Sequence, residues 1–119
     1  MADLTLAYEA RSYSSGTPGR AICNARNHHI VADGPGGEAL GAGELFLSGI
    51  AACAVNMVHR VAQSDAIPMN WLDVRVASYQ DPDKEPGQLT VWDEVQVHLE
   101  IWGVDDDQGT YLVDVWKKR

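Results

Sequence analysis

Residues 44–65 read ELFLSGIAACAVNMVHRVAQSD, and this stretch decides the fold of the 119-residue chain. Its apolar side chains recur at steps of three and four residues, and no charge occurs from Leu45 to Val58. The spacing predicts a helix that is apolar on nearly every face and must be buried on nearly every side. An uncharged run of roughly 10–14 residues is typical of a core helix, whereas ~20 are needed to cross a bilayer, so we do not expect a membrane helix. Four small residues would let another backbone approach closely: Gly49, Ala51, Ala52 and Ala54.

Cys53 lies near the middle of this predicted helix, on the face that also carries Phe46 and Met57. A thiol becomes reactive as its thiolate, which requires a helix N-terminus or a nearby cation. Cys53 follows the first helical residues by about nine positions, which is too far for the dipole of its own helix to act. A reactive Cys53 would therefore need a cation from another segment. Spacing alone favours the alternative, a small apolar core residue.

The composition limits the class of protein. A net charge of −8 argues against a nucleic-acid partner, and 45% hydrophobic residues are enough for the core of one domain. The first ten residues, MADLTLAYEA, lack the charged and apolar regions of a signal peptide, which predicts a cytoplasmic protein. Two cysteines, Cys23 and Cys53, are too few for a disulfide framework, so we expect free thiols.

Strand patterns flank the predicted helix on both sides. We expect strands over residues 4–14, 20–24 and 28–32 before it, and over residues 71–79 and 89–104 after it. A glycine-rich loop (residues 34–43) precedes the helix, and a polar turn (residues 80–88) separates the last two strands. We expect a bend at the charged Asp93. A short C-terminal helix should follow the acidic cap Asp105–Asp107. Antiparallel meanders around one helix predict an α+β fold. Because one three-stranded meander cannot cover every side of that helix, we expect a homodimer.

Four further polar residues are candidates for chemistry with Cys53. Glu44 begins the helix, and at 100° per residue it falls on the side opposite Cys53. It could assist Cys53 only by fixing an arginine, and a carboxylate at a helix start is also explained by the helix dipole alone. The N-terminal cations Arg11, Arg20 and Arg26 could each supply the missing positive charge, or could be solvated strand residues.

No metal or hydrolase motif is present. The four histidines are spaced unlike metal ligands, and the sequence contains neither CxxC nor HxxxH. Ser48 lacks a GxSxG setting, and Cys23 is most simply a packing residue. We therefore expect no metal and no cofactor.

The stretch from Arg26 to Ala62 resembles the OsmC/Ohr family (osmotically induced protein C / organic hydroperoxide resistance). The carrying features are Asp33-Gly34-Pro35, the Gly36-Gly37 loop, and Glu44-Leu45-Phe46 followed, nine residues after Glu44, by Ala51-Ala52-Cys53. The resemblance implies one domain over residues 1–119, with a shortened C-terminal helix. It also implies an intertwined homodimer whose antiparallel sheets wrap around buried cysteine-bearing helices.

The resemblance also implies an activity, the reduction of organic hydroperoxides. Cys53 would attack the peroxide, Arg20, chosen for its place beside the first turn, would stabilise the thiolate, and Glu44 would orient that arginine. Relatives carry a second cysteine in the C-terminal helix, and this chain has none there. The reaction would therefore need an external thiol as reductant.

Two functions stay open at this point. The first is a thiol-dependent hydroperoxide reductase, favoured by Cys53 and its spacing from Glu44. The second is a non-catalytic OsmC-like dimer that binds a small hydrophobic ligand or senses redox state. It is favoured by the missing second cysteine and by Gly43, which stands where the peroxidase subgroup has its glutamate, after Ala42 in place of the usual proline. Whether the chain is an enzyme is not decided by the sequence.

Overall fold

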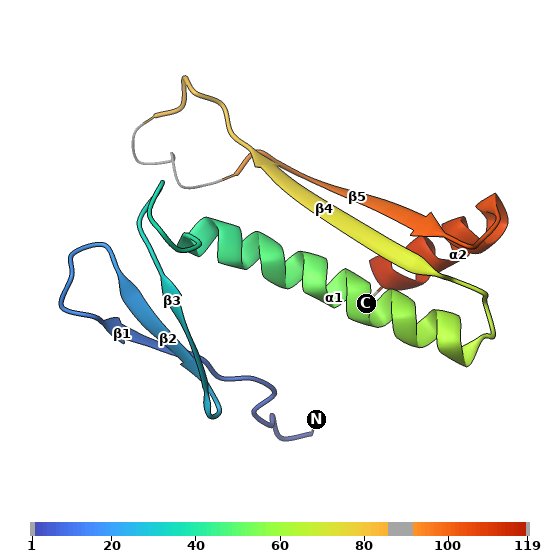
Figure 1. Ribbon diagram of the computed structural model, residues 1–119, viewed down its shortest axis with the longest axis horizontal. Coiled ribbons are helices and arrows are strands. Elements are labelled where there is room, and N and C mark those ends of the chain that lie inside the picture. Colours follow the sequence, from blue (N-terminus) through green and yellow to red (C-terminus); the bar gives the residue numbers. More distant parts are fainter. Residues whose placement is uncertain (1, 86–91, 119) are drawn as a thin grey trace. The chain divides into compact units, whose positions relative to one another are not determined.

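The computed structural model describes residues 2–85 and 92–118, and the chain forms two compact units, Met1–Phe46 and Leu47–Arg119 (Figure 1). The fold is α+β with antiparallel sheets, as the sequence predicts. In chain order the elements are β1 (Arg11–Ser14), β2 (Ala21–Ala25), β3 (His28–Ala32), α1 (Ala42–Ser64), β4 (Trp71–Tyr79), β5 (Glu94–Trp102) and α2 (Asp106–Lys117).

The first unit contains the antiparallel sheet β1-β2-β3. A tight turn joins β1 to β2, in which the Ser15 hydroxyl donates to the carbonyl of Arg20 at 2.9 Å. The strand predicted over residues 4–14 is too long, since β1 begins only at Arg11. Arg11 pairs with Asn24, one residue before β2 ends, so β2 offers almost no backbone to pair with the residues that precede Arg11.

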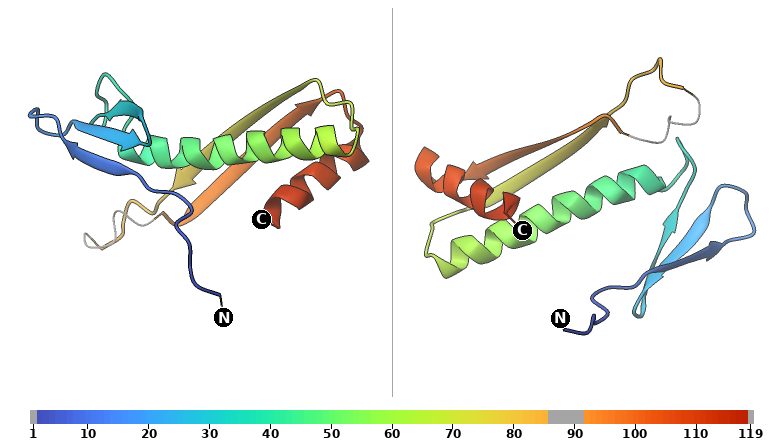
Figure 2. Two further views of the ribbon diagram at one scale, coloured as in Figure 1. Left: turned by 90° about the horizontal axis from the view of Figure 1, so that it is seen from below. Right: turned by 180° about the vertical axis from the view of Figure 1, so that it is seen from behind.

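The second unit is a long hairpin covered by helices. β4 and β5 pair over nine residues each, from Trp71 opposite Trp102 to Tyr79 opposite Glu94. Alternation along β4 directs Leu72 toward the core and leaves Trp71 exposed. The part of α1 in this unit and α2 lie on the same side of the hairpin (Figure 2). They build a core cluster whose buried residues are Val58, Ala62, Leu72 and Leu112.

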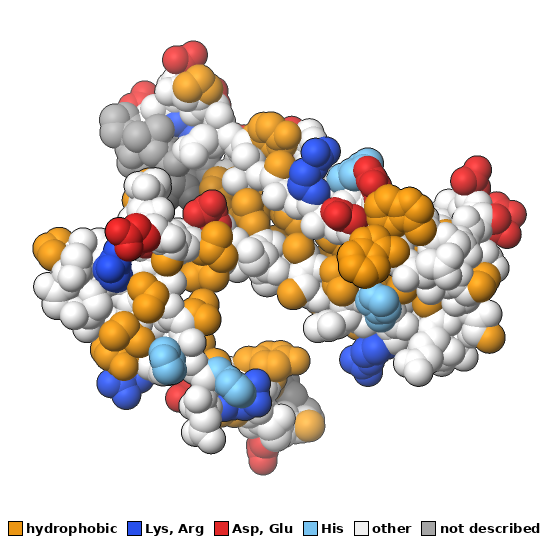
Figure 3. All heavy atoms as spheres, viewed as in Figure 1, with side chains coloured by type: hydrophobic (Ala, Val, Ile, Leu, Met, Phe, Trp, Pro, Cys, Tyr) orange, Lys and Arg blue, Asp and Glu red, His pale blue; other side chains and the backbone are white. Residues whose placement is uncertain are grey.

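Helix α1 confirms the predicted helix, although it begins two residues earlier. Its buried residues are Ala54, Val58 and Ala62, which recur every four positions and form one stripe. The face that carries Cys53 is exposed, and hydrophobic side chains are visible along the helix (Figure 3). Burial on nearly every side, which the sequence predicts, is therefore not supplied by the unit that contains this part of the helix. By length and composition alone α1 could also span a membrane, a test that the core helix of a soluble protein passes as well.

The bend predicted at Asp93 and the helix cap predicted at Asp105 are both confirmed. Asp93 lies at a bend just before β5, where its carboxylate accepts from the N–H of Asp81 at 2.7 Å and pairs with Lys84 at 2.8 Å. The hydrogen bond from Lys84 lowers the pKa of the Asp93 carboxyl. The strand predicted over residues 89–104 is shorter than expected, because β5 covers Glu94–Trp102. Residues 86–91, which include the end of the predicted turn 80–88 and the start of this predicted strand, lie outside the described residues.

Asp105 caps α2 with a reciprocal pair of bonds. Its carboxylate accepts from the N–H of Gln108 at 2.8 Å, and its own N–H donates to the Gln108 side chain at 3.0 Å. The capping box satisfies two donors that a helix start otherwise leaves unpaired.

Replacing this cap should destabilise the chain. Asp105→Ala removes the acceptor for Gln108, so we expect the free energy of unfolding to fall by about 1 kcal/mol. Asp105→Asn keeps an oxygen in the same place and should retain most of that stability. Denaturant unfolding of both variants checks the prediction, and equal losses in the two variants would contradict it.

Candidate functional site

Arg20 and Asp33 form an ion pair at one end of the first sheet. Arg20 immediately precedes β2, and Asp33 immediately follows β3. The register of these strands pairs Ala21 with Ala32, so the next positions along both strands face each other. The guanidinium Nη2 lies 2.9 Å from the Asp33 Oδ2. Only 11% of the Asp33 side chain is exposed, so this carboxylate is largely withdrawn from water.

The Asp33 carboxylate also organises the loop that leads to α1. It accepts from the N–H groups of Gly34 at 3.0 Å, Glu38 at 3.0 Å and Ala39 at 3.4 Å. With Arg20, four donors therefore converge on one side chain. The hydrogen bond from Arg20 is the largest of the effects that hold the pKa of the Asp33 carboxyl below its usual range. Such a charge-assisted network fixes both the arginine and the loop.

Gly37 is required by the same network. A Cβ atom at this position would lie 2.4 Å from the Cγ of Asp33, closer than real Cβ contacts allow. Sequence reasoning included Asp33 and Gly37 only as features of the resemblance and gave Asp33 no role. The available signal was an acidic residue directly at a strand end, followed by Gly34-Pro35-Gly36-Gly37.

Arg20 is positioned by more than one carboxylate. Its Nη2 also lies 3.8 Å from Glu38, and Asp33 is the main reason that the pKa of Arg20 is raised. The Nε of Arg20 is buried and has no hydrogen-bond partner within residues 2–85 and 92–118. A buried donor without a partner is uncommon in folded proteins, and a bound group is one explanation.

The other two N-terminal arginines have local settings. The guanidinium of Arg11 lies over the ring of Tyr13, 5.1 Å from its centroid. Arg26 stands in the turn between β2 and β3 with a φ of 56°. Among these candidates, the structure thus gives Arg20 the most constrained position.

Glu44 has a structural role at the start of α1. Its Oε1 accepts from the N–H of Gly41 at 2.9 Å, and the carbonyl of Gly41 receives the first helical bond, from Leu45. The Glu44 side chain therefore makes one of the two hydrogen bonds of a capping box, the one that accepts from the N–H of the N-cap residue. In the part of the first unit that the structure describes, Arg20 pairs with Asp33 and Glu38, and Glu44 bonds instead to Gly41.

Cys53 lies on α1 in the second unit as a free, exposed thiol. The next residue, Ala54, is completely buried. Cys53 lies beside it on the exposed face of the helix, which points away from the core of its unit. Cys53 therefore does not fill the core of its own chain, which was the alternative to a reactive role. Cys23 is also free, and it is half-buried on β2 between Ser12 and Ile30. The described residues contain no group of three His, Cys, Asp or Glu side chains arranged to hold a metal ion.

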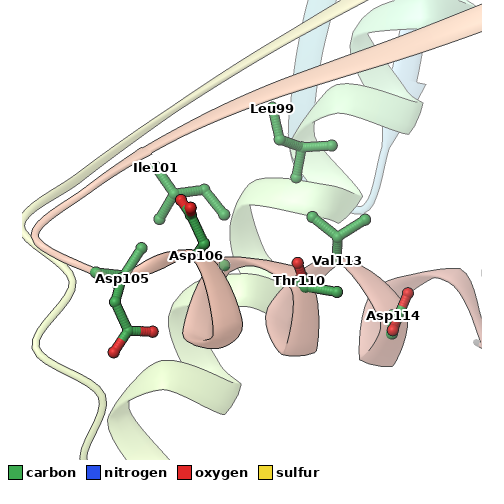
Figure 4. A pocket seen from close by; sticks show the side chains of 9 residues that line it. Leu99, Ile101, Asp105, Asp106, Thr110, Val113 and Asp114 are labelled. Carbon is green, nitrogen blue, oxygen red and sulfur yellow. The ribbon is translucent and has the colours of Figure 1, made fainter.

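Each unit contains more than one cavity among the described residues. In the first unit, a cavity of about 670 Å³ is bounded by β3, the loop after it and the start of α1. In the second, a cavity of about 420 Å³ between β5 and α2 is lined by Leu99, Ile101, Val113 and three aspartates (Figure 4). Both volumes lie in the range of small-molecule sites, about 300–1,000 Å³. Neither of these two cavities contains a thiol or an arginine in its lining, so neither by itself offers a means of activating a peroxide.

Adding a methyl group at Gly37 should disturb the Asp33 network. Because the new Cβ of Gly37→Ala would overlap Asp33, we expect a loss of about 1–3 kcal/mol in the free energy of unfolding. Gly34→Ala is the matched control, since its Cβ would meet nothing closer than the Gly19 carbonyl at 3.8 Å. Denaturant titration of both variants measures the difference. A Gly37→Ala variant as stable as the control would show that the loop is not packed as described.

Comparison with known proteins locates this architecture among solved structures. The OsmC-like protein of Mycoplasma pneumoniae matches with a TM-score of 0.82 and 19% identity, over 98% of this chain and 84% of that one. The organic hydroperoxide resistance protein OsmC of Legionella pneumophila matches with a TM-score of 0.67 and 19% identity, over 98% and 85%. The organic hydroperoxide resistance protein OhrB of Bacillus subtilis gives 0.61 and 15%, over 95% and 84%.

No family model and no curated protein matches the sequence. At 14–19% identity, the shared feature is the arrangement of the backbone along nearly the whole chain. This arrangement includes the strand, loop and helix that carry the resemblance between Arg26 and Ala62. The chain therefore has the fold of the OsmC/Ohr proteins.

Proposed function

We propose that the chain belongs to the OsmC/Ohr family and reduces organic hydroperoxides through Cys53, with an external thiol as reductant. The observation that carries this proposal is the free, exposed thiol halfway along α1 in a chain of this fold. Two structural neighbours bear the name organic hydroperoxide resistance protein. Cys53 stands in the sequence context, Ala51-Ala52-Cys53, that the resemblance associates with the reacting thiol.

The reaction requires two steps. In the first, the Cys53 thiolate attacks the terminal oxygen of the peroxide, the O–O bond breaks, and the alkoxide leaves as an alcohol after taking up a proton. Cys53 is oxidised to a sulfenic acid. In the second, an external thiol displaces water from the sulfenic acid to form a mixed disulfide, and a second external thiol releases reduced Cys53 and an external disulfide. The peroxide is thus reduced by two electrons that come from the two external thiols.

Arg20 and Glu44 are assigned supporting roles in this proposal. Arg20 is held by Asp33 through one terminal nitrogen, which leaves its Nε and its other terminal nitrogen able to donate. Those donors would stabilise the Cys53 thiolate and the leaving oxygen. Glu44 would act by fixing the first turn of α1 through Gly41, so that the helix carrying Cys53 begins at a defined place.

A homodimer is part of the proposal, and its support is the uncovered face of α1. Burying that face against a second copy would remove apolar surface from water, which is the main driving force for association. Small residues beside Cys53, including Ala51 and Ala52, would permit close helix packing. A helix covered in this way belongs to a soluble protein, and a cytoplasmic location would keep both cysteines reduced.

The second candidate is a non-catalytic OsmC-like dimer that binds a small apolar ligand or senses redox state. It is favoured by one observation, the pairing of Arg20 with Asp33 and Glu38, which already compensates the positive charge that Cys53 would need. Reactivity separates the candidates. Rapid alkylation of Cys53 at neutral pH indicates an activated thiolate, and slow alkylation indicates an inert thiol.

Removing the thiol should abolish the reaction without affecting assembly. We expect Cys53→Ser to lose consumption of cumene hydroperoxide in the presence of a dithiol, because serine cannot form the sulfenic acid. Cys23→Ser, the matched control at the other cysteine, should keep wild-type turnover. Peroxide loss and molar mass are measured for both variants. Full activity in Cys53→Ser would remove this residue from the mechanism.

A charge on the uncovered face of α1 should weaken the dimer. Ala52 is exposed in the single chain, so Ala52→Glu should leave each chain folded while placing an uncompensated carboxylate in the predicted interface. The control Gln63→Glu adds the same charge at an exposed position in the last turn of the helix. Sedimentation velocity should show a dimer for wild type and control, and a shift toward monomer for Ala52→Glu. A monomeric wild-type protein would refute the proposed assembly.

A further inference from the structure

A further cavity lies between the last turns of α1 and helix α2, in the unit that also contains Cys53. Its volume of about 370 Å³ falls within the range of small-molecule sites. Met57 and Val61 give it an apolar wall, and Arg60 stands between them on α1. Tyr111 of α2 lines the other side. The cavity therefore offers apolar surface beside a guanidinium group.

This cavity adjoins Cys53 along one face of α1. With about 100° of rotation per residue, Met57 lies about 40° and Arg60 about 20° from Cys53 around the helix axis. The seven-residue step from Cys53 to Arg60 corresponds to about 10 Å along the axis. Both residues belong to the continuous helix Ala42–Ser64, so this spacing does not depend on any other segment. The interface predicted at Ala52 lies about 100° to the side of Cys53 that is opposite Met57, which leaves the path from Cys53 to the cavity open.

Arg60 carries a positive charge that the described part of its unit does not neutralise. Its side chain is exposed, and no carboxylate within residues 2–85 and 92–118 forms an ion pair with its guanidinium. Asp65, the carboxylate that lines the same cavity, accepts instead from the hydroxyl of Tyr111. A guanidinium presents parallel N–H donors that match the two oxygens of a carboxylate. A ligand in this cavity therefore meets a free group that is suited to an anion.

We propose that Arg60 binds the carboxylate of an organic hydroperoxide whose peroxide group reacts at Cys53, while the chain between the two groups lies over Met57 and Val61. The inference rests on the proposed function and makes Arg60 a specificity-determining residue of that reaction. Because the helix holds Arg60 about 10 Å from Cys53, the site selects hydroperoxides by length as well as by charge. An ion pair that faces solvent contributes little, so the selection is several-fold rather than absolute.

The test uses linear hydroperoxides that bear a terminal carboxylate at graded distances from the peroxide, each paired with its methyl ester and kept below micelle formation. Acid and ester share one peroxide and one chain, so the ratio of their kcat/KM values isolates the carboxylate. The net charge of −8 disfavours acids of every length, so the dependence on length reports the contact with Arg60. For the wild-type protein at low salt, we expect the ratio of acid to ester to peak about threefold above its value for short chains, where the extended chain spans about 10 Å. The peak should weaken as salt is added.

Two variants that each remove one positive charge assign the effect to the cavity. Arg60→Gln should abolish the peak, because the group that binds the carboxylate is gone. Arg75→Gln removes an exposed arginine from β4, outside the cavity lining, and should keep the peak at the same chain length. Equal behaviour of the two variants would assign the selectivity to net charge and overturn the role of Arg60.

Cumene hydroperoxide, which has no carboxylate, separates this inference from the function on which it rests. If the wild-type protein consumes cumene hydroperoxide but the ratio of acid to ester does not depend on chain length, the assignment of Arg60 is wrong and the reductase activity stands. If the protein consumes none of these peroxides, both the activity and the selectivity are wrong.

Discussion

Helix α1 carries more apolar surface than the core of its own unit covers, and the proposed assembly follows from this constraint. One stripe, Ala54, Val58 and Ala62, is buried, and Val58 and Ala62 pack in one cluster with Leu72 of β4 and Leu112 of α2. The face of Cys53 stays exposed in the single chain. A helix of this kind is stable in water only when another surface covers it. The homodimer proposed here would supply that surface and would place the Cys53 thiol in a largely apolar setting. In such a setting, an organic hydroperoxide is a more suitable substrate than hydrogen peroxide, which is strongly hydrated.

The carboxylate of Asp33 is the second interaction on which the structure depends, because it links Arg20 to the loop before α1 within the first unit. It holds Arg20 at the end of the first turn and, through the N–H groups of Glu38 and Ala39, shapes the loop before α1. A guanidinium secured in this way is oriented before any substrate arrives, and preorganised donors are more effective than mobile ones. The same pairing, together with Glu38 at 3.8 Å, limits the net positive charge that Arg20 presents.

The sequence predicted the central helix and the bounds of several strands. Residues 28–32 and 71–79 match β3 and β4, and the charged Asp93 correctly marked a bend. The strand proposed for residues 4–14 was too long, because its alternating pattern says nothing about whether a partner strand extends far enough to pair with it. The role of Asp33 was missed for a related reason. Its four donors come from backbone groups and from Arg20, thirteen residues away, and no local spacing reveals such convergence.

The account depends most directly on whether Cys53 reacts with a peroxide. The measurement is the intact mass of the fully reduced wild-type protein after one equivalent of cumene hydroperoxide, without added thiol, followed by peptide mapping. The account predicts the gain of one oxygen atom per chain, located on Cys53 as a sulfenic acid, together with one equivalent of the alcohol. An unmodified Cys53 beside intact peroxide would contradict it, and would direct attention to ligands of a non-catalytic dimer.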